Sequence, residues 1–165
     1  MIKSLERILG HKIISAIPVG GGNIADSQKI TTHKGEYFAK ISREPGSKFR
    51  EEAAGLKALS DKGLLRVPAV FHADDHFLLL EWIEPAEPKG DFWKRFGSGL
   101  AQLHKISHDQ FGFNSNNHIG TTPQANPLRA YREISWAEYF IDYRLKAMLN
   151  HKVLSVETLL QLEFQ

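Results

Sequence analysis

The segment Glu84-Pro85-Ala86-Glu87-Pro88 separates two parts of the chain that have different sequence patterns. Two prolines this close interrupt helix and sheet alike, because each lacks a backbone N–H donor and has a fixed φ angle. Before this segment, short apolar and β-branched runs alternate with glycine-containing turns, which is typical of strands. After it, apolar residues recur at helical spacing. The pattern predicts an α+β chain with two domains, residues 1–84 and residues 85–165.

The expected elements follow from apolar periodicity and from turn residues. Before the proline segment we predict a helix at residues 2–9, strands at residues 12–19, 27–32 and 36–42, a helix at residues 49–60, and strands at residues 68–71 and 76–83. After it we predict helices at residues 92–103, 136–147 and 153–162. A polar loop, residues 107–127, separates the first two of these helices.

Composition and charge exclude several classes of function. Of the 165 residues, 42% are hydrophobic and 24% are charged, which is the balance of a folded globular protein. The formal net charge is +2 with both signs interspersed, so we expect no nucleic-acid partner. The absence of cysteine excludes disulfides and thiol catalysis and fits a reducing compartment. No apolar run resembles a membrane span or a signal peptide, so we expect a cytoplasmic protein without a membrane partner.

Three glycines, Gly20, Gly21 and Gly22, occupy the turn between the first two predicted strands. Glycines at such a turn let the backbone approach a phosphate, since no Cβ intervenes and the N–H groups are exposed. The spacing fits neither a Walker loop, which needs a following Lys-Ser/Thr, nor a dinucleotide-binding turn, which opens a helix. A flexible hairpin turn explains the triplet equally well.

Two charged residues that follow the glycine turn in the sequence, Lys40 and Glu52, could complete a phosphate site there. Lys40 lies on the strand after the glycine hairpin, where its side chain can reach beneath the turn to nucleotide phosphates. A lysine in that role needs a carboxylate to hold it, and Glu52 on the next helix is a better candidate than Glu51. The alternative is that all three are solvated surface charges, as most lysines and glutamates are.

The apolar strand Leu78-Leu79-Leu80 continues into Glu81-Trp82-Ile83 and then into the proline segment. In a two-lobed kinase, such a strand end presents backbone N–H and C=O groups to an adenine ring. Glu81, Trp82 and Ile83 at the end of this strand are suggestive of such a site. The alternative is a core strand that ends in an interfacial tryptophan.

Together these residues resemble the small lobe of a kinase, and finer patterns narrow the resemblance to the fructosamine (ketosamine-3-) kinase family. The motifs that carry it recur in order with matching gaps: Gly20-Gly21-Gly22-x-Ile24, Tyr37-Phe38-Ala39-Lys40, Glu52-Ala53-x-Gly55-Leu56, Leu100-Ala101-x-Leu103-His104, Phe111-Gly112-Phe113, Asn117-His118-Ile119-Gly120, Thr122-Pro123-Gln124-x-Asn126, Trp136, Phe140 and Arg144-Leu145. The resemblance implies a protein-kinase-like bilobal fold. An antiparallel sheet with one helix would form the small lobe, followed by an incomplete helical lobe.

The resemblance implies ATP-dependent phosphorylation of a sugar hydroxyl on a ketosamine, the adduct that a sugar forms with an amine. By position, the loop Gly20–Ile24 would cover the phosphates. Lys40 would hold the α- and β-phosphates, and Glu52 would orient Lys40. Glu81, Trp82 and Ile83 would form the adenine hinge, and Phe38, two residues before Lys40 on the same strand face, would roof the adenine. Asn23 stands where some family members have cysteine, so redox control through that residue is excluded.

The family's catalytic base and Mg²⁺ ligands come from a later His-Gly-Asp-Leu-x-x-x-Asn type loop and a following Asp, and neither occurs in these 165 residues. The segment His108–Gly112 contains fragments of kinase signatures but matches none of them. No catalytic residue or metal ligand is therefore assigned, although ATP and Mg²⁺ are the expected cofactors. We expect the chain alone to be inactive, with its catalytic residues beyond Gln165.

Several alternatives stay open. A short product that binds nucleotide or a protein partner without phosphotransfer would have the same small-lobe residues, and a kinase of the aminoglycoside or choline type would have the same lobes. The amide-rich loop Phe111–Asn126 either lies near the sugar site or only builds turns. His104 and His108, four apart on a helix, could bind a metal, but a packed role for His104 is favoured. Apolar helix faces in an incomplete lobe would be exposed, so we also expect dimerisation, segment swapping or aggregation.

Overall fold

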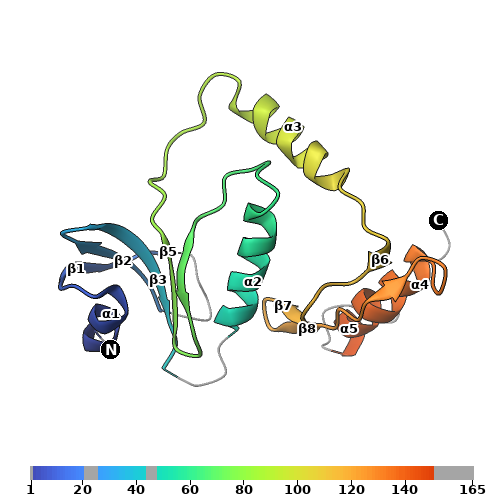
Figure 1. Cartoon of the computed structure of the whole chain (residues 1–165), viewed down its shortest axis with the longest axis horizontal. Coiled ribbons are helices and arrows are strands. Elements are labelled where there is room, and N and C mark those ends of the chain that lie inside the picture. Colours follow the sequence, from blue (N-terminus) through green and yellow to red (C-terminus); the bar gives the residue numbers. More distant parts are fainter. Residues whose placement is uncertain (1, 21–25, 44–47, 151–165) are drawn as a thin grey trace. The chain divides into compact units, whose positions relative to one another are not determined.

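The computed structural model describes residues 2–20, 26–43 and 48–150 (Figure 1). The chain forms two compact units, residues 1–106 and residues 107–165, and each is described by itself. The first unit is built around a five-stranded sheet with helices on both faces. The second contains short strands and a helical segment.

The sheet of the first unit is antiparallel throughout and has the strand order β1-β2-β3-β5-β4. Its strands are β1 (Ile13–Pro18), β2 (Asp26–Thr32), β3 (Gly35–Ile41), β4 (Val70–Ala73) and β5 (Phe77–Glu81). Two helices, α1 (Ile2–Leu9) and α2 (Phe49–Ser60), lie on opposite faces of the sheet (Figure 1). All seven elements agree with the sequence prediction to within two residues at each end: β4 lies two residues later than expected, and β5 ends two residues earlier.

Helix α1 covers one face of the sheet, to which Ala39 and Ile41 of β3 and Phe77 and Leu79 of β5 contribute their side chains. Leu5 of α1 is 1% exposed and packs in one apolar cluster with Ile30, Ala39, Ile41 and residues of β5. Because successive side chains of a strand point to opposite faces, Lys40 points away from α1. Burial of each large aliphatic side chain contributes about 1.5–3 kcal/mol, so this cluster anchors the strand that carries Lys40.

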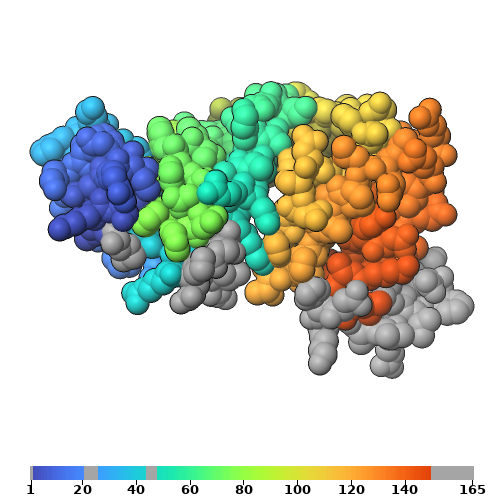
Figure 2. All heavy atoms as spheres, turned by 60° about the horizontal axis from the view of Figure 1, so that its bottom comes forward, coloured from blue at the N-terminus to red at the C-terminus, as the bar shows by residue number. Residues whose placement is uncertain are grey.

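Helix α2 covers the opposite face. Phe49 packs with Leu78 and Leu80 of β5, and Ala53 and Leu56 lie around them. Residues 49, 53 and 56 are spaced three and four apart, which puts them on one side of the helix. Figure 2 shows the atoms of α2 (teal) directly beside those of β4 and β5 (green). The helix is thus held against the face to which Lys40 points.

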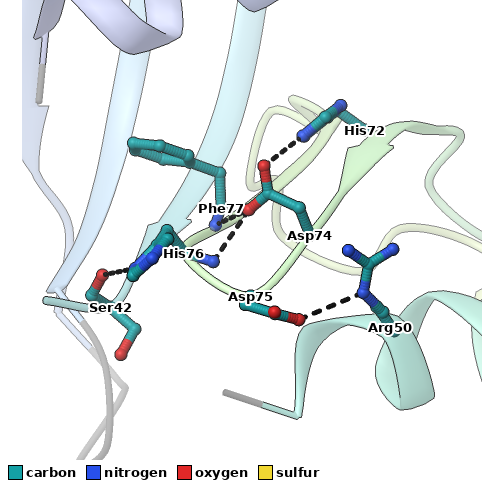
Figure 3. Close-up of polar contacts among 7 residues, drawn as sticks. All are labelled: Ser42, Arg50, His72, Asp74, Asp75, His76 and Phe77. Atoms are coloured by element: carbon teal, nitrogen blue, oxygen red, sulfur yellow. Dashed lines mark hydrogen bonds and ion pairs between the residues drawn. The ribbon is translucent and has the colours of Figure 1, made fainter. Parts of the chain in front are cut away.

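The turn between β4 and β5 is organised by Asp74 (Figure 3). Its Oδ1 accepts hydrogen bonds from the backbone N–H groups of His76 and Phe77, both at 2.7 Å, and its Oδ2 lies 2.7 Å from His72 Nε2. Burial alone would raise the pKa of Asp74, but the hydrogen bonds from His72 and from the two backbone N–H groups outweigh it and lower the pKa. The turn is therefore held by an ionised carboxylate.

The same turn ties neighbouring elements to the sheet. Arg50, in the first turn of α2, donates from Nε to Asp75 Oδ1 at 3.1 Å. The backbone N–H of Ser42, directly after β3, donates to the carbonyl of His76 at 2.9 Å. These contacts fasten the start of α2 and the end of β3 to one turn. Figure 3 shows the Arg50–Asp75 contact and a further one, in which Nδ1 of the His76 ring lies 3.3 Å from the carbonyl oxygen of Ser42.

Helix α3 (Phe92–His104) follows the proline segment, which has no regular structure. Gly99 marks its close approach to the segment before β4, since a Cβ there would lie 2.7 Å from Leu65 Cδ2 and 2.9 Å from the carbonyl oxygen of Leu64. The domain boundary at residues 84 and 85 stays a prediction. Within the described ranges, no helix is long and apolar enough to cross a membrane.

The second unit contains two short antiparallel strand pairs, with three of the four strands inside the segment predicted as a polar loop, residues 107–127, and the fourth just after it. Strand β6 (Gln110–Phe111) pairs with β9 (Arg129–Ala130), and β7 (Asn117–Ile119) pairs with β8 (Thr122–Gln124). Strands of two or three residues are too short to show an alternating apolar pattern, so periodicity does not predict them.

A helical segment completes the described part of the second unit. It consists of α4 (Trp136–Phe140), a π-helical turn η1 (Ile141–Leu145) and α5 (Lys146–Asn150). Tyr139, 1% exposed, packs with Phe111, Trp136 and Tyr143, with ring centroids 4.8–6.1 Å apart. The helix predicted at residues 153–162 lies outside the described residues.

Candidate functional site

Lys40 and Glu52 form an ion pair on the face of the sheet that α2 covers. Lys40 Nζ lies 2.7 Å from Glu52 Oε1 and 2.9 Å from Glu52 Oε2, so the ammonium contacts both carboxylate oxygens. The side chains are 28% and 37% exposed, which leaves the pair accessible from solvent. The pairing predicted between these residues is present in the structure.

Strand and helix geometry bring the two residues together. Lys40 is opposite Leu78 in the β3–β5 pairing, and Leu78 belongs to the cluster beneath α2. Glu52 lies in the first turn of α2, directly before Ala53, which packs on the same cluster. A carboxylate in the first turn is also stabilised by the positive end of the helix dipole. The packing of α2 therefore brings the Glu52 carboxylate to the lysine.

Cross-strand register places further side chains beside Lys40. Lys29 of β2 is opposite Phe38 of β3, and Phe38 is opposite Leu80 of β5. Directly opposite residues of antiparallel strands project to the same face, and Phe38 precedes Lys40 by two residues. The Phe38 ring also lies nearly parallel to the Trp82 indole, with centroids 6.5 Å apart and an interplanar angle of 25°. This face therefore combines a cation, suited to a phosphate, with aromatic surface, suited to a planar ring.

The predicted hinge begins where β5 ends. Pairing between β3 and β5 stops at Glu81, and the chain continues through Trp82 and Ile83 without regular structure. Glu81 itself is bound to the sheet, because its N–H donates to the carbonyl of Ala69 at 2.8 Å and its carboxylate accepts from Arg66 Nη2 at 2.6 Å. Glu81 therefore fixes the start of the segment predicted as a hinge, while Trp82 and Ile83 lie beyond the paired strand.

Two charged residues at the hinge were not predicted from the sequence. Lys29 Nζ lies 2.9 Å from Glu36 Oε1 and 3.4 Å from Glu84 Oε2, and it stands 4.6 Å from the centre of the Trp82 ring. Trp82 Nε1 donates to Glu84 Oε2 at 2.6 Å. The hydrogen bond to Glu36 raises the pKa of Lys29, and the hydrogen bond from Trp82, with the charge of Lys29, lowers the pKa of Glu84. Lys29 and Glu84 are 55 residues apart, so local spacing gives no sign of their contact.

The glycine turn joins the sheet next to Lys40. Ser27, near the start of β2, is opposite Lys40, and its carbonyl accepts a hydrogen bond from Val19 N–H at 3.0 Å. Gly20 follows Val19 and is exposed. The remaining predicted residues of the turn, Gly21, Gly22, Asn23 and Ile24, lie outside the described residues, so their contact with phosphates stays a prediction.

The segment His108–Gly112 has a structural role. Phe111 belongs to β6 and packs in the aromatic cluster of Tyr139. His108 and Asp109 are exposed and contact each other at 3.0 Å. In the described ranges, no group of three or more His, Asp or Glu side chains could hold a metal ion. His104 is exposed, so the packed role predicted for it is wrong.

Asn126 uses its side-chain amide within the second unit. Its Nδ2 donates to the carbonyl of Ser115 and to Asn117 Oδ1, both at 3.0 Å, and its Oδ1 accepts from Arg144 Nη2 at 2.6 Å. The residue is only 5% exposed. These contacts favour the turn-building role of the amide-rich loop over sugar binding at this residue.

Comparison with known proteins identifies the relatives of this chain. The family model of fructosamine kinase matches residues 1–158. A probable ketoamine kinase of Synechocystis sp. is 36% identical over 133 residues, which cover 77% of this chain and 44% of the relative. The chloroplastic protein-ribulosamine 3-kinase of Oryza sativa subsp. indica is 34% identical over 147 residues, or 84% of this chain and 42% of the relative.

Solved structures show the same fold. A protein of Haemophilus somnus assigned as a fructosamine-3-kinase superposes with a TM-score of 0.75 at 27% sequence identity, covering 90% of this chain and 52% of that protein. The present chain thus spans about half the length of the relatives that it matches. The matched part has the kinase-like fold, with the antiparallel sheet and α2 of an N-terminal lobe.

Proposed function

Because this chain belongs to the fructosamine kinase family, we propose that it supplies the ATP-binding half of a kinase that phosphorylates a sugar hydroxyl of a ketosamine. The observation that carries the proposal is the Lys40–Glu52 pair. In kinases, a lysine on a strand is held by a glutamate on the neighbouring helix, and the pair must be in place for phosphoryl transfer. The same pair lies here next to the strand ends that hold the glycine turn.

The ion pair leaves one N–H donor of Lys40 for a phosphate. An ammonium group has three N–H donors, and Glu52 accepts two of those of Lys40. The third is proposed to donate to a phosphate oxygen, while Glu52 keeps the lysine from turning into solvent. The residues Gly20–Ile24 would cover the phosphates from above.

The base would bind on the same face of the sheet. Phe38 supplies aromatic surface two residues from Lys40, and the backbone of Trp82 and Ile83 would form hydrogen bonds with the edge of an adenine. Phosphates and base would thus be bound by neighbouring positions of β3 and the segment that follows β5.

The acceptor is proposed from the names of the relatives, which are kinases of ketoamines and of protein-bound ribulosamines. In both compounds a sugar is joined to an amine. A sugar hydroxyl would attack the γ-phosphorus, lose its proton to a base and displace ADP. The base is not assigned among the described residues.

Kinases of this kind also use Mg²⁺, bound by carboxylates and by the phosphates. The described residues contain no group of three or more His, Asp or Glu side chains that could hold the ion. The residues that would hold the ion are therefore not assigned, and we derive no step through the metal.

The proposal is tested by the thermal unfolding of the chain with and without ATP. Ligand at 100 times its dissociation constant stabilises a protein by about 2.7 kcal/mol, so the wild-type melting temperature should rise by several degrees. Lys40→Ala should lose most of this rise. Lys34→Ala, in the exposed turn between β2 and β3, is the matched control and should keep it.

Equal stabilisation of Lys40→Ala and wild type by ATP would contradict the assignment of Lys40. A chain extended to the length of its relatives that binds ATP but transfers no phosphate to a fructosamine would support the non-catalytic alternative instead.

A further inference from the structure

We propose that Lys29 and Glu84 are positioning residues that hold the hinge against β2 and fix the Trp82 indole beside the base-binding surface. The hinge clamp is the group of four residues Lys29, Glu36, Trp82 and Glu84. The inference rests on the proposed function, since it concerns the part of the site that would take the purine ring. Lys29 and Glu84 would thus contribute to nucleotide binding through Trp82, without contacting the phosphates.

The hinge clamp joins three separate elements through one ammonium group. Lys29 comes from the middle of β2, Glu36 from β3, and Trp82 and Glu84 from the segment after β5. Lys29 Nζ contacts both carboxylates, at 2.9 and 3.4 Å, and lies 4.6 Å from the indole centre. The clamp thus connects the hinge to the sheet independently of the β3–β5 pairing, which stops at Glu81.

The position of Lys29 on the sheet explains why it needs these partners. Its side chain is 21% exposed, and it stands opposite Phe38 on an aromatic surface. Removal of an ammonium from water is unfavourable unless other groups replace the lost hydration. Two carboxylates and the electron-rich face of an indole do so here. In other conformations of the hinge, Lys29 would lose the Glu84 carboxylate and the Trp82 indole as partners.

The indole is restrained at two points. Its Nε1–H donates to Glu84 Oε2 at 2.6 Å, and its ring face is in contact with Lys29. Glu84 in turn contacts Lys29, so the three groups close a ring of interactions. In this orientation the indole lies within 25° of parallel to the Phe38 ring. Loss of either charge would therefore free both the indole and the segment that carries it.

A restrained hinge lowers the entropic cost of binding a base, because the segment is already ordered. The clamp does not reach the phosphate-binding end, since Lys29 is opposite Phe38 whereas Lys40 is opposite Ser27. Its effect should be confined to ligands that carry a base. ATP and inorganic tripolyphosphate separate these contributions, since only ATP has a purine.

The test compares the dissociation constants of ATP and tripolyphosphate for the wild-type chain, Lys29→Met and Glu84→Gln. Both variants should bind ATP about three- to tenfold more weakly, the range expected for loss of a cation–π contact and its ion pair. Their affinity for tripolyphosphate should change much less. Lys34→Met, in the exposed β2–β3 turn, is the control and should match wild type.

The two variants change the net charge in opposite directions, which separates the clamp from general electrostatics. A long-range charge effect would weaken ATP binding in Lys29→Met and strengthen it in Glu84→Gln, whereas the clamp predicts weaker binding in both. Hydrogen exchange without ligand provides a second readout. Amides of the non-proline residues between 82 and 89 should exchange several-fold faster in both variants, while those of β5 stay as protected as in wild type.

Unchanged ATP affinity in both variants would overturn this inference alone. Tighter ATP binding in both would also overturn it, because the indole would then obstruct the site that it is proposed to prepare. Failure of the wild-type chain to bind ATP would overturn the proposed function, and the inference with it.

Discussion

Gly112 occupies a backbone position that other residues do not fit. Its φ angle is +107°, and a Cβ there would lie 2.4 Å from the carbonyl oxygen and 2.9 Å from the carbonyl carbon of Pro127. Both are backbone atoms, which cannot turn aside as the end of a side chain can. The Phe-Gly-Phe motif of this chain therefore has a steric explanation that needs no catalytic role.

We predict that Gly112→Ala lowers the free energy of unfolding of the chain by about 2–4 kcal/mol, because strain and overlap add. Gly55→Ala is the control. Gly55 lies inside α2 with open space around it, so alanine there should stabilise by up to about 1 kcal/mol. Urea unfolding followed by circular dichroism measures both. An unchanged midpoint in Gly112→Ala would show that the backbone near Pro127 adapts.

The candidate site was predictable from the sequence only in part, and the reason lies in the distances along the chain. Lys40 and Glu52 are 12 residues apart on consecutive elements, so strand alternation and helix periodicity indicate their meeting. Lys29 and Glu84 are 55 residues apart and meet only because the sheet order puts β3 between β2 and β5. No local pattern carries that information.

At the level of elements, the apolar pattern correctly predicted the longer helices and strands, whereas it did not predict the short strands. The seven elements of the sheet layer were predicted to within about two residues. Strand β4 begins at Val70 and not at Pro68, since proline lacks the N–H that a paired strand uses, and Ala69 instead donates to Glu81 Oε2. The short strands β6 to β9 depend on tertiary contacts, which leave no periodic signature.

The β4–β5 turn should make stability depend on pH through Asp74. Its pKa is lowered in the folded chain, so its carboxylate contributes stability that is full above the unfolded value, about 3.9, and is lost as the pH falls through the folded pKa. We predict that Asp74→Asn is about 1 kcal/mol less stable at pH 7, because an amide accepts weaker hydrogen bonds.

The same variant should lose less stability than wild type between pH 5 and pH 3. Urea titrations at pH 7, 5 and 3 provide the comparison. Parallel losses in the two proteins would assign the acid sensitivity to other carboxylates, among them Glu138, whose pKa the Ser135 hydroxyl lowers.

On the scale of the molecule, the helices after the proline segment expose much aromatic surface. Trp93 is 68% exposed, Phe96 42% and Trp136 57%. Large exposed apolar patches commonly mark surfaces that another part or another molecule covers. Since this chain spans about half the length of its relatives, we propose that it self-associates when isolated.

Sedimentation velocity should therefore show dimers or larger species whose fraction grows between about 1 and 100 µM, a range in which exposed apolar surface promotes association. The double variant Trp93→Ser, Trp136→Ser should shift the distribution towards monomer. A wild-type chain that stays monomeric over this range would contradict the proposal.

Lys40 is proposed to lie at the phosphates of a bound nucleotide, and chemical labelling tests this directly. An ATP analogue with a reactive acyl group on its terminal phosphate transfers that group to a lysine beside the phosphates, and mass spectrometry then locates the modified residue. Acylation is expected mainly at Lys40 and should be suppressed by excess ATP. Acylation spread over exposed lysines such as Lys34 and Lys62, without protection by ATP, would contradict it.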